Sequence, residues 1–187
     1  ALEESYFQTP LMTMLKKRVG LLAVLFISGF FSCEILKNYE GSFEKWGLLM
    51  VFLPIIISAG GNSGTQAASL IIRGLAIKEL NIQDAWRVLN KEIIVGLVLG
   101  LLLAFIGFGR SVTWGMGSQI GMLIGCSVLG VVVFGVVVGS MLPFLLQKMK
   151  LDPAVVSSPL ISTLMDVAGV LIYLRFSLWF LSSFPVP

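Results

Sequence analysis

The chain contains no histidine, only two cysteines and few charged residues, and each shortage excludes a class of chemistry. Without histidine there is no His-based metal site, no Ser-His-Asp triad and no Cys-His nucleophile. Cys33 and Cys126, each in an apolar run, are too few for a zinc cluster or a disulfide framework. An enzyme built from this chain would have to work with Asp, Glu, Ser or Lys.

Charge is scarce because most of the chain is apolar. Asp, Glu, Lys and Arg make up 12% of the 187 residues, against about a quarter in an ordinary globular domain. Hydrophobic residues make up 57%, and the mean hydropathy is +0.96. This composition indicates an integral membrane protein. The net charge of +3 is modest and unevenly placed, so nucleic acid is not an expected partner.

Uncharged runs divide the chain into transmembrane helices. A helix needs about 20 mostly apolar residues to cross roughly 30 Å of hydrocarbon. The longest uncharged run is residues 111–147, and its polar, glycine-rich start favours one span over two. We predict an all-α polytopic membrane protein with five transmembrane helices, near residues 19–37, 46–72, 90–109, 119–147 and 155–181.

The distribution of Lys and Arg predicts how these helices are oriented. With five spans, nine Lys and Arg residues lie on one side of the membrane and three on the other, while Arg175 lies inside the last span. The side rich in Lys and Arg is normally cytoplasmic, so we expect a cytoplasmic N-terminus and an external C-terminus. A signal peptide after residues 16–18 is the alternative, but Glu34 stands where a small-residue cleavage site belongs.

Two segments on the Lys- and Arg-rich side are predicted to lie along the membrane surface. Residues 79–89 combine apolar and polar side chains with the spacing of a short amphipathic helix. Residues 1–18 have a similar pattern and end in a basic cluster. Neither segment is expected to form a separate domain.

Asp166 is an acidic residue deep in the fifth predicted helix. A carboxylate near the middle of a bilayer costs several kcal/mol, so it indicates a site for an ion, a proton or a partner charge. Ser158 and Ser162 lie on the same helical face, and Gly169 continues this face. Two other interpretations stay open: Asp166 is buried, neutral and hydrogen-bonded, or it pairs with Arg175.

The second predicted helix carries a second polar stripe. Pro54 removes a backbone donor, and the glycines after it weaken the helix while letting backbones approach closely. Irregular backbone at membrane depth is tolerated only against protein or a water-filled cavity. The alternative is a packing seam of small residues. The stripe consists of Ser58, Asn62, Gln66 (or Thr65), Ser69 and Arg73.

The two stripes together offer hydroxyl, amide and carbonyl oxygens and one carboxylate. These are ligands for a hard cation such as Mg²⁺, which dehydrates reluctantly and is held through its waters. Five helices from one short chain would struggle to enclose an ion path. A symmetric dimer would bring two copies of Asp166 to one axis, where two carboxylates balance a divalent ion.

Several segments resemble the MgtE family of magnesium channels and transporters, which is related to the eukaryotic solute carrier family 41. Residues 60–66 (Gly-Gly-Asn-Ser-Gly-Thr-Gln) and 73–76 (Arg-Gly-Leu-Ala) resemble its signature. Residues 152–154 (Asp-Pro-Ala), 158–159 (Ser-Pro) and 163–169 (Thr-Leu-Met-Asp-Val-Ala-Gly) resemble its last helix. The likeness covers essentially the whole chain.

The resemblance implies a homodimer with an ion path along the two-fold axis, between the second and fifth helices. Asp166 matches the central Mg²⁺-coordinating aspartate, and Glu40 resembles an acidic residue at the outer mouth. Ser58 departs from a common glycine, and Ser158 from a common Asn or Gly. The expected metal-site residues are Asp166, Asn62, Ser162, Ser58 and Ser158. The expected pore-lining residues are Pro54, Gly60, Gly61, Gly64, Gln66 and Gly169.

The resemblance also implies a function and a domain organisation. We expect residues 1–187 to be the ion-conducting domain of a plasma-membrane Mg²⁺ channel or transporter, not an enzyme, that moves Mg²⁺ into the cytoplasm. Residues 1–18 resemble the remnant of a connecting helix, and residues 19–187 the pore domain. Because the chain begins with Ala1, we expect a piece of a longer protein without its cytoplasmic CBS domains. The alternatives are a cation/proton antiporter and a non-conducting membrane subunit.

Overall fold

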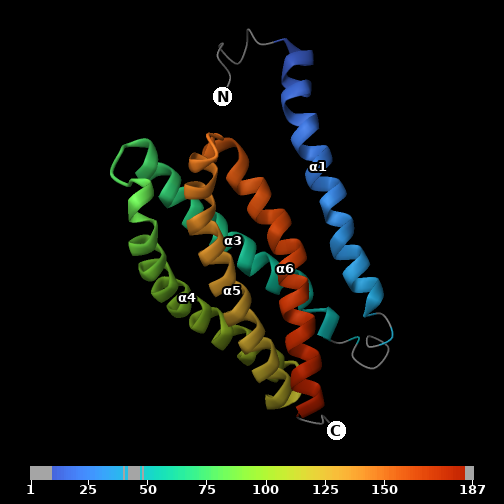
Figure 1. The fold of residues 1–187 in the computed structure, drawn as a ribbon. Coiled ribbons are helices and arrows are strands. Elements are labelled where there is room, and N and C mark those ends of the chain that lie inside the picture. Colours follow the sequence, from blue (N-terminus) through green and yellow to red (C-terminus); the bar gives the residue numbers. More distant parts are fainter. Residues whose placement is uncertain (1–9, 40, 42–46, 48, 184–187) are drawn as a thin grey trace.

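The computed structural model describes residues 10–39, 41, 47 and 49–183, and this part of the chain is helical without strands. Within these described residues, five long helices and one short 3-10 helix follow one another (Figure 1). The predicted all-α class is therefore confirmed. The elements are α1 (Leu11–Asn38), α3 (Leu53–Ala76), η1 (Ile82–Asp84), α4 (Ala85–Thr113), α5 (Gly117–Lys148) and α6 (Pro153–Ser183).

Two predictions near the helix ends were wrong. Residues 79–89 do not form a separate amphipathic helix, because η1 occupies residues 82–84 and α4 begins at Ala85. The first helix does not start after the basic cluster but at Leu11, so this cluster lies inside α1. In both places the described part of the predicted surface segment continues into the following span as one helix or nearly so.

The structure breaks the second predicted helix, because residues 47, 49 and 50 are helical but α3 itself begins only at Leu53. A turn at residues 51–52 precedes it, and Pro54 stands in its first helical turn. Proline suits this position because its missing N–H would have no helical acceptor there and its fixed φ fits the helix. Pro54 therefore stands where the chain starts a new helix after the turn, not in the middle of a continuous one.

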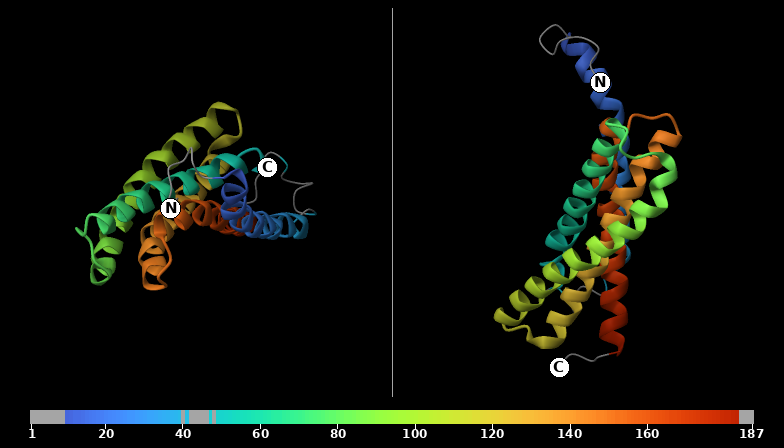
Figure 2. Two further views of the ribbon diagram at one scale, coloured as in Figure 1. Left: turned by 90° about the horizontal axis from the view of Figure 1, so that it is seen from above. Right: turned by 90° about the vertical axis from the view of Figure 1, so that its left-hand side faces the viewer.

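Helix α5 is the centre of the bundle and packs against α3, α4 and α6. Helix α4 lies at one edge and α1 at the opposite edge, where α1 contacts α6 (Figures 1 and 2). Within the described residues, α4, α5, α6 and α1 are long and apolar enough to cross a membrane. Helix α3 has 24 residues and spans about 36 Å, so it is long enough as well. Its polar stripe lowers its hydropathy, and it is not among these four candidate spans.

Helices α3 and α5 cross at paired glycines. A Cβ atom added at Gly139 would overlap the carbonyl oxygen of Gly64, and one added at Gly135 would overlap that of Gly60. Small residues four positions apart on both helices let the backbones touch, as in other membrane helix pairs. This contact fixes one face of α3 against the core and turns its other face outward.

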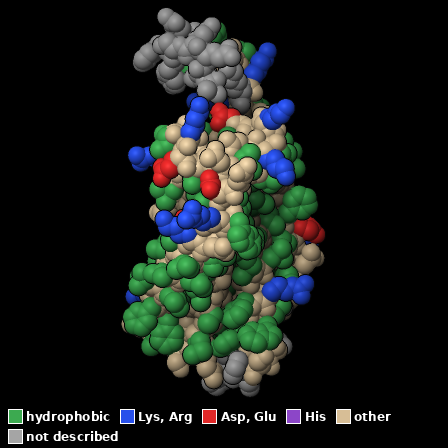
Figure 3. Space-filling view, turned by 60° about the vertical axis from the view of Figure 1, so that its left-hand side comes forward, with side chains coloured by type: hydrophobic (Ala, Val, Ile, Leu, Met, Phe, Trp, Pro, Cys, Tyr) green, Lys and Arg blue, Asp and Glu red, His purple; other side chains and the backbone are tan. Residues whose placement is uncertain are grey.

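Most Lys and Arg side chains gather at one end of the molecule, above a broad hydrophobic surface (Figure 3). This end holds the start of α1, the α3–α4 connection and the α5–α6 connection (Figure 1). Arg110, near the end of α4, lies at the opposite end, over the ring of Trp114. The bundle is therefore electrically asymmetric along its long axis.

Candidate ion site

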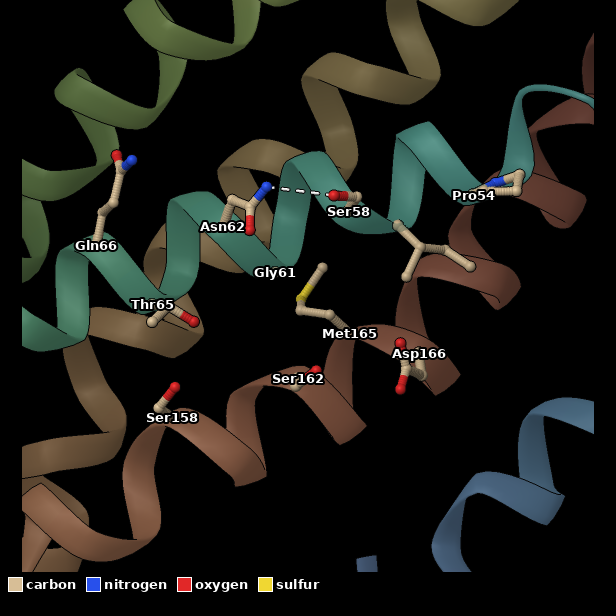
Figure 4. Close-up of a pocket in the computed structure, with 11 residues that line it drawn as sticks. Pro54, Ser58, Gly61, Asn62, Thr65, Gln66, Ser158, Ser162, Met165 and Asp166 are labelled. Atoms are coloured by element: carbon tan, nitrogen blue, oxygen red, sulfur yellow. Dashed lines mark hydrogen bonds between the residues drawn. The ribbon is translucent and has the colours of Figure 1, made fainter. Parts of the chain in front are cut away.

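An open cleft of about 790 Å³ lies between α3 and α6 (Figure 4). The two helices run in opposite directions, so Ser158 lies near Thr65 while Asp166 lies toward the Pro54 end. The cleft is lined by Pro54, Ile57, Ser58, Gly61, Asn62, Thr65, Gln66, Ser158, Ser162, Met165 and Asp166.

Helix α3 supplies one wall because its polar residues recur every three or four positions and so share a face. The Asn62 Nδ2 atom donates a hydrogen bond to the Ser58 Oγ atom at 3.2 Å (Figure 4). The opposite face of α3 carries the glycines that contact α5. One face of α3 is therefore a packing seam and the other lines a cavity.

Helix α6 supplies the facing wall. Ser158, Ser162 and Asp166 stand one turn apart on it, and all three side chains are exposed to the cleft. Among the residues that the structure describes, Asp166 forms no hydrogen bond and no ion pair, and Arg175 does not pair with it. Within one chain Asp166 is thus neither buried nor neutralised by a partner.

The cleft brings together all five residues of the expected metal site. Of the expected pore-lining set, it also brings in Pro54, Gly61 and Gln66. Gly60 and Gly64 lie elsewhere, buried against α5 and against side chains of α6. Gly169 is buried beside Ile57. Glu40 lies outside the described residues.

Two apolar side chains in the cleft were missed by the sequence reasoning. Ile57 and Met165 line it, and Met165 is fully buried with its terminal methyl group at Gly60. An apolar residue at helical spacing in a transmembrane helix carries no signal that separates lining from packing. Thr65, considered only as an alternative to Gln66, is present as well, seven residues after Ser58.

A smaller groove of about 410 Å³ lies on the other side of the polar stripe, between α3 and α4. Ser58, Asn62 and Gln66 border both hollows. The far wall of the groove is apolar and consists of Leu99, Leu102 and Leu103. The amide and hydroxyl groups of α3 therefore form a ridge that is open on two sides in a single chain.

The donor set of the cleft consists of hydroxyl, amide and carboxylate oxygens, which suit a hard cation. Within the described residues, no three Asp, Glu, Cys or His side chains come together as a metal cage. One carboxylate cannot replace the water shell of a divalent ion. The chemistry fits an ion that keeps most of its waters and contacts the protein through them.

Four of the described helices are long and apolar enough to cross a membrane, and an open cleft lined by hydroxyl, amide and carboxylate oxygens lies in the bundle. These two features are typical of a helical membrane transport protein. Residues 53–176 match the profile of the MgtE family, described as a divalent cation transporter. The chain belongs to the MgtE family, which comprises ion transporters and not enzymes. The resemblance seen in the sequence is confirmed, and the chain is a multi-pass membrane protein.

Three curated relatives, each named magnesium transporter MgtE, are similar to the chain. The identity is 43% over 157 residues for the Thermus thermophilus protein, 30% over 181 for that of Bacillus subtilis and 31% over 181 for that of Enterococcus faecalis. The matches cover 84%, 95% and 97% of this chain. The chain spans only 35%, 39% and 40% of the length of these relatives.

Proposed function

We propose that the chain conducts Mg²⁺ across the plasma membrane into the cytoplasm, along a path lined by α3 and α6. The observation that carries this proposal is the α3–α6 cleft, in which one exposed carboxylate, Asp166, faces a stripe of neutral oxygens. An exposed carboxylate at membrane depth is costly unless it meets a cation or water. The printed names of the three relatives, magnesium transporters, favour Mg²⁺ as this cation.

The path is formed by two copies of the chain in a symmetric dimer. The cleft is open in one chain, and among the described residues that line it Asp166 is the only carboxylate. A two-fold axis along the cleft would place a second Asp166 opposite the first, and two carboxylates balance one divalent charge. The ion would keep its inner waters, with Asn62, Ser58, Ser158 and Ser162 as acceptors for them.

The orientation follows from the asymmetric charge of the bundle. The end that carries the α3–α4 and α5–α6 connections holds Arg73, Lys78, Arg87, Lys148 and Lys150. Short connections rich in Lys and Arg remain cytoplasmic. The N-terminus is therefore cytoplasmic, the Asp166 end of the cleft lies toward the external side, and the inside-negative membrane potential drives Mg²⁺ inward.

Ion flux through the purified chain in liposomes tests this function. A Mg²⁺ indicator inside the vesicles reports influx while a potassium gradient with valinomycin fixes the membrane potential. We expect Asp166→Asn, which keeps size and removes charge, to lower Mg²⁺ influx at least tenfold. Such a loss corresponds to about 1.4 kcal/mol or more of lost ion stabilisation.

Glu34→Gln is the matched control, since Glu34 is an acidic residue of the apolar helix α1 and does not line the cleft. This variant should conduct like the unchanged chain. Equal influx in Asp166→Asn would contradict the site. Influx coupled to proton efflux would select a cation/proton antiporter, and flux only after addition of a partner protein would select a non-conducting subunit.

A further inference from the structure

A third hollow, separate from the α3–α6 cleft, lies where α3 ends and α4 begins. Its volume is about 520 Å³. Part of its wall is apolar, formed by Leu70, Ile77, Leu80 and Val88. The rest is charged, with the cations Arg73, Arg87 and Lys91 and the carboxylates Glu79 and Glu92. A pocket with an apolar wall beside a cationic rim suits an amphipathic anion.

The turn that closes this pocket has a defined geometry. Lys78 adopts a φ of 61°, and the Glu79 N–H donates to the carbonyl of Gly74 at 2.9 Å, which ends α3 in a Schellman turn. The Leu80 side chain folds back onto Gly74, where an added Cβ atom would lie 2.7 Å from its Cδ1 atom. Asn81 and Asp84 then form a capping box, with the Asn81 N–H donating to Asp84 at 2.8 Å.

The charges of the pocket leave a positive excess. Three cations face two carboxylates, and Lys91 interacts electrostatically with Glu92. Within the described part of the chain, Arg73 and Arg87 form no ion pair with either carboxylate. All three cations are exposed. Guanidinium and ammonium groups in this arrangement offer several donors to one phosphate group.

The pocket stands at the level of the membrane–water interface. Trp86 is the second residue of α4, next to Arg87, and is 71% exposed, and tryptophan favours the headgroup level of a bilayer. Further along α4, Ile94 is 64% exposed and Phe105 is 79% exposed, as expected of a surface that faces lipid. In Figure 3 the basic side chains of this end stand directly above the hydrophobic surface.

We propose that this pocket binds the headgroup of an anionic phospholipid. The lipid phosphate lies among Arg73, Arg87 and Lys91, and its acyl chains run along the apolar wall toward the exposed face of α4. Basic pockets between transmembrane helices bind anionic headgroups in this way. A free phosphate would use the cations but would leave Leu70 and Ile77 without a ligand, so the apolar wall favours the lipid.

Native mass spectrometry of the purified chain in detergent tests this proposal. Phosphatidylglycerol and phosphatidylcholine with identical acyl chains compete for binding, and the ratio of bound lipids is the readout. We expect a preference for phosphatidylglycerol that falls about fivefold for each cation removed in Arg73→Gln, Arg87→Gln and Lys91→Gln, since one basic residue near the surface is worth about 1 kcal/mol. Glu79→Gln should raise the preference about fivefold, a gain that a misfolded variant would not give.

Lys148→Gln and Lys150→Gln are the matched controls, because both lysines belong to the same end of the bundle and lie outside the pocket. Their preference should stay unchanged. An equal loss in the controls would overturn the proposal in favour of general attraction to an anionic surface. Displacement of the lipid by glycerol phosphate or inorganic phosphate at equal concentration would overturn it in favour of a soluble phosphate.

Discussion

Tyr173 joins the cleft-lining helix α6 to the start of α3. Its side chain is fully buried, and its hydroxyl donates a 2.6 Å hydrogen bond to the carbonyl of Leu49. Leu49 precedes the turn at residues 51–52 that opens α3, where helical hydrogen bonding is interrupted. The hydrogen bond therefore fixes the Pro54 end of the cleft relative to Asp166, which lies seven residues before Tyr173.

Removing this hydrogen bond should destabilise the bundle without changing its packing. Tyr173→Phe deletes one oxygen atom and leaves the Leu49 carbonyl without this donor. We expect the free energy of unfolding to fall by about 1–2 kcal/mol. Unfolding in denaturing detergent, followed by circular dichroism, measures this change, with Ser183→Ala at the exposed end of α6 as the control. The Leu49 carbonyl also accepts from the Phe52 N–H at 3.1 Å, so no change in Tyr173→Phe would mean that this backbone donor alone is sufficient.

Sequence patterns predict polar lining residues better than apolar ones. Asp166, Ser162 and Asn62 were found because a charge or an amide in a membrane helix needs a polar environment. Gly60 and Gly64 were expected to line the pore but are buried against α5 in the single chain, since a glycine fits both a packing seam and a cavity wall. Only the approach of α5 to one face of α3 decides between the two, and this approach depends on residues far away in the sequence.

At the scale of elements, the crossing of α3 and α5 positions the polar face of α3. Gly139 lies so close to Gly64 that an added methyl group would overlap backbone that cannot move aside. In Gly139→Ala we expect a loss of about 1–3 kcal/mol from overpacking. Gly109→Ala is the control, because Gly109 lies in helix α4 with open space around it.

The control should be neutral or slightly stabilising, since alanine is preferred over glycine in a helix by about 1 kcal/mol. Equilibrium unfolding of both variants in the same detergent makes the comparison. A Gly139→Ala variant as stable as the control would show that α3 and α5 can separate without cost. Reduced Mg²⁺ influx should accompany the loss of stability, because the same contact orients the cleft face of α3.

The end of α5 is held in a conformation that favours glycine but is occupied by lysine. Lys150 has a φ of 59°, and the Leu151 N–H donates to the carbonyl of Leu146 at 2.9 Å. Lys150→Gly should stabilise the bundle by roughly 0.5–1 kcal/mol. Glycine adopts this left-handed conformation without steric strain, and this gain exceeds the extra conformational entropy that glycine gives to the unfolded chain. Lys148→Gly, inside the helix, should act in the opposite direction. A loss of stability in Lys150→Gly would contradict this reasoning.

Helix existence was predictable from the uncharged runs, whereas helix starts were not. The runs show where charge is absent, but a helix can continue past a charged residue at the interface, as α1 does through its basic cluster. The start of α3 depended on Pro54, which is compatible both with a kink and with a first turn. Only the folded structure decides between the kink and the first turn, and the hydrogen bond from Tyr173 to Leu49 is one of its tertiary contacts at this place.

At the scale of the whole molecule, no helix that the structure describes closes over the ridge of α3. Helix α1 contacts α6 at one edge of the bundle and α4 lies at the opposite edge (Figure 2). The described residues that line the cleft all belong to α3 and α6. Polar groups of Ser58, Asn62 and Gln66 at membrane depth require water or a second protein surface. The proposed dimer supplies both, because two clefts facing each other enclose a water-filled path.

This assembly predicts that the two copies of residue 166 are close neighbours. The background variant carries Cys33→Ala and Cys126→Ala, which removes both exposed thiols. In this background, two copies of Asp166→Cys should be cross-linked by a short bis-maleimide whose length matches the diameter of a hydrated ion. The product should migrate at twice the 20.3 kDa of one chain. Phe105→Cys, on the lipid-facing side of α4, should stay monomeric under the same treatment. Cross-linking of Phe105→Cys but not of Asp166→Cys would place the dimer contact on α4 and leave the cleft facing lipid, an arrangement incompatible with an ion path on the two-fold axis.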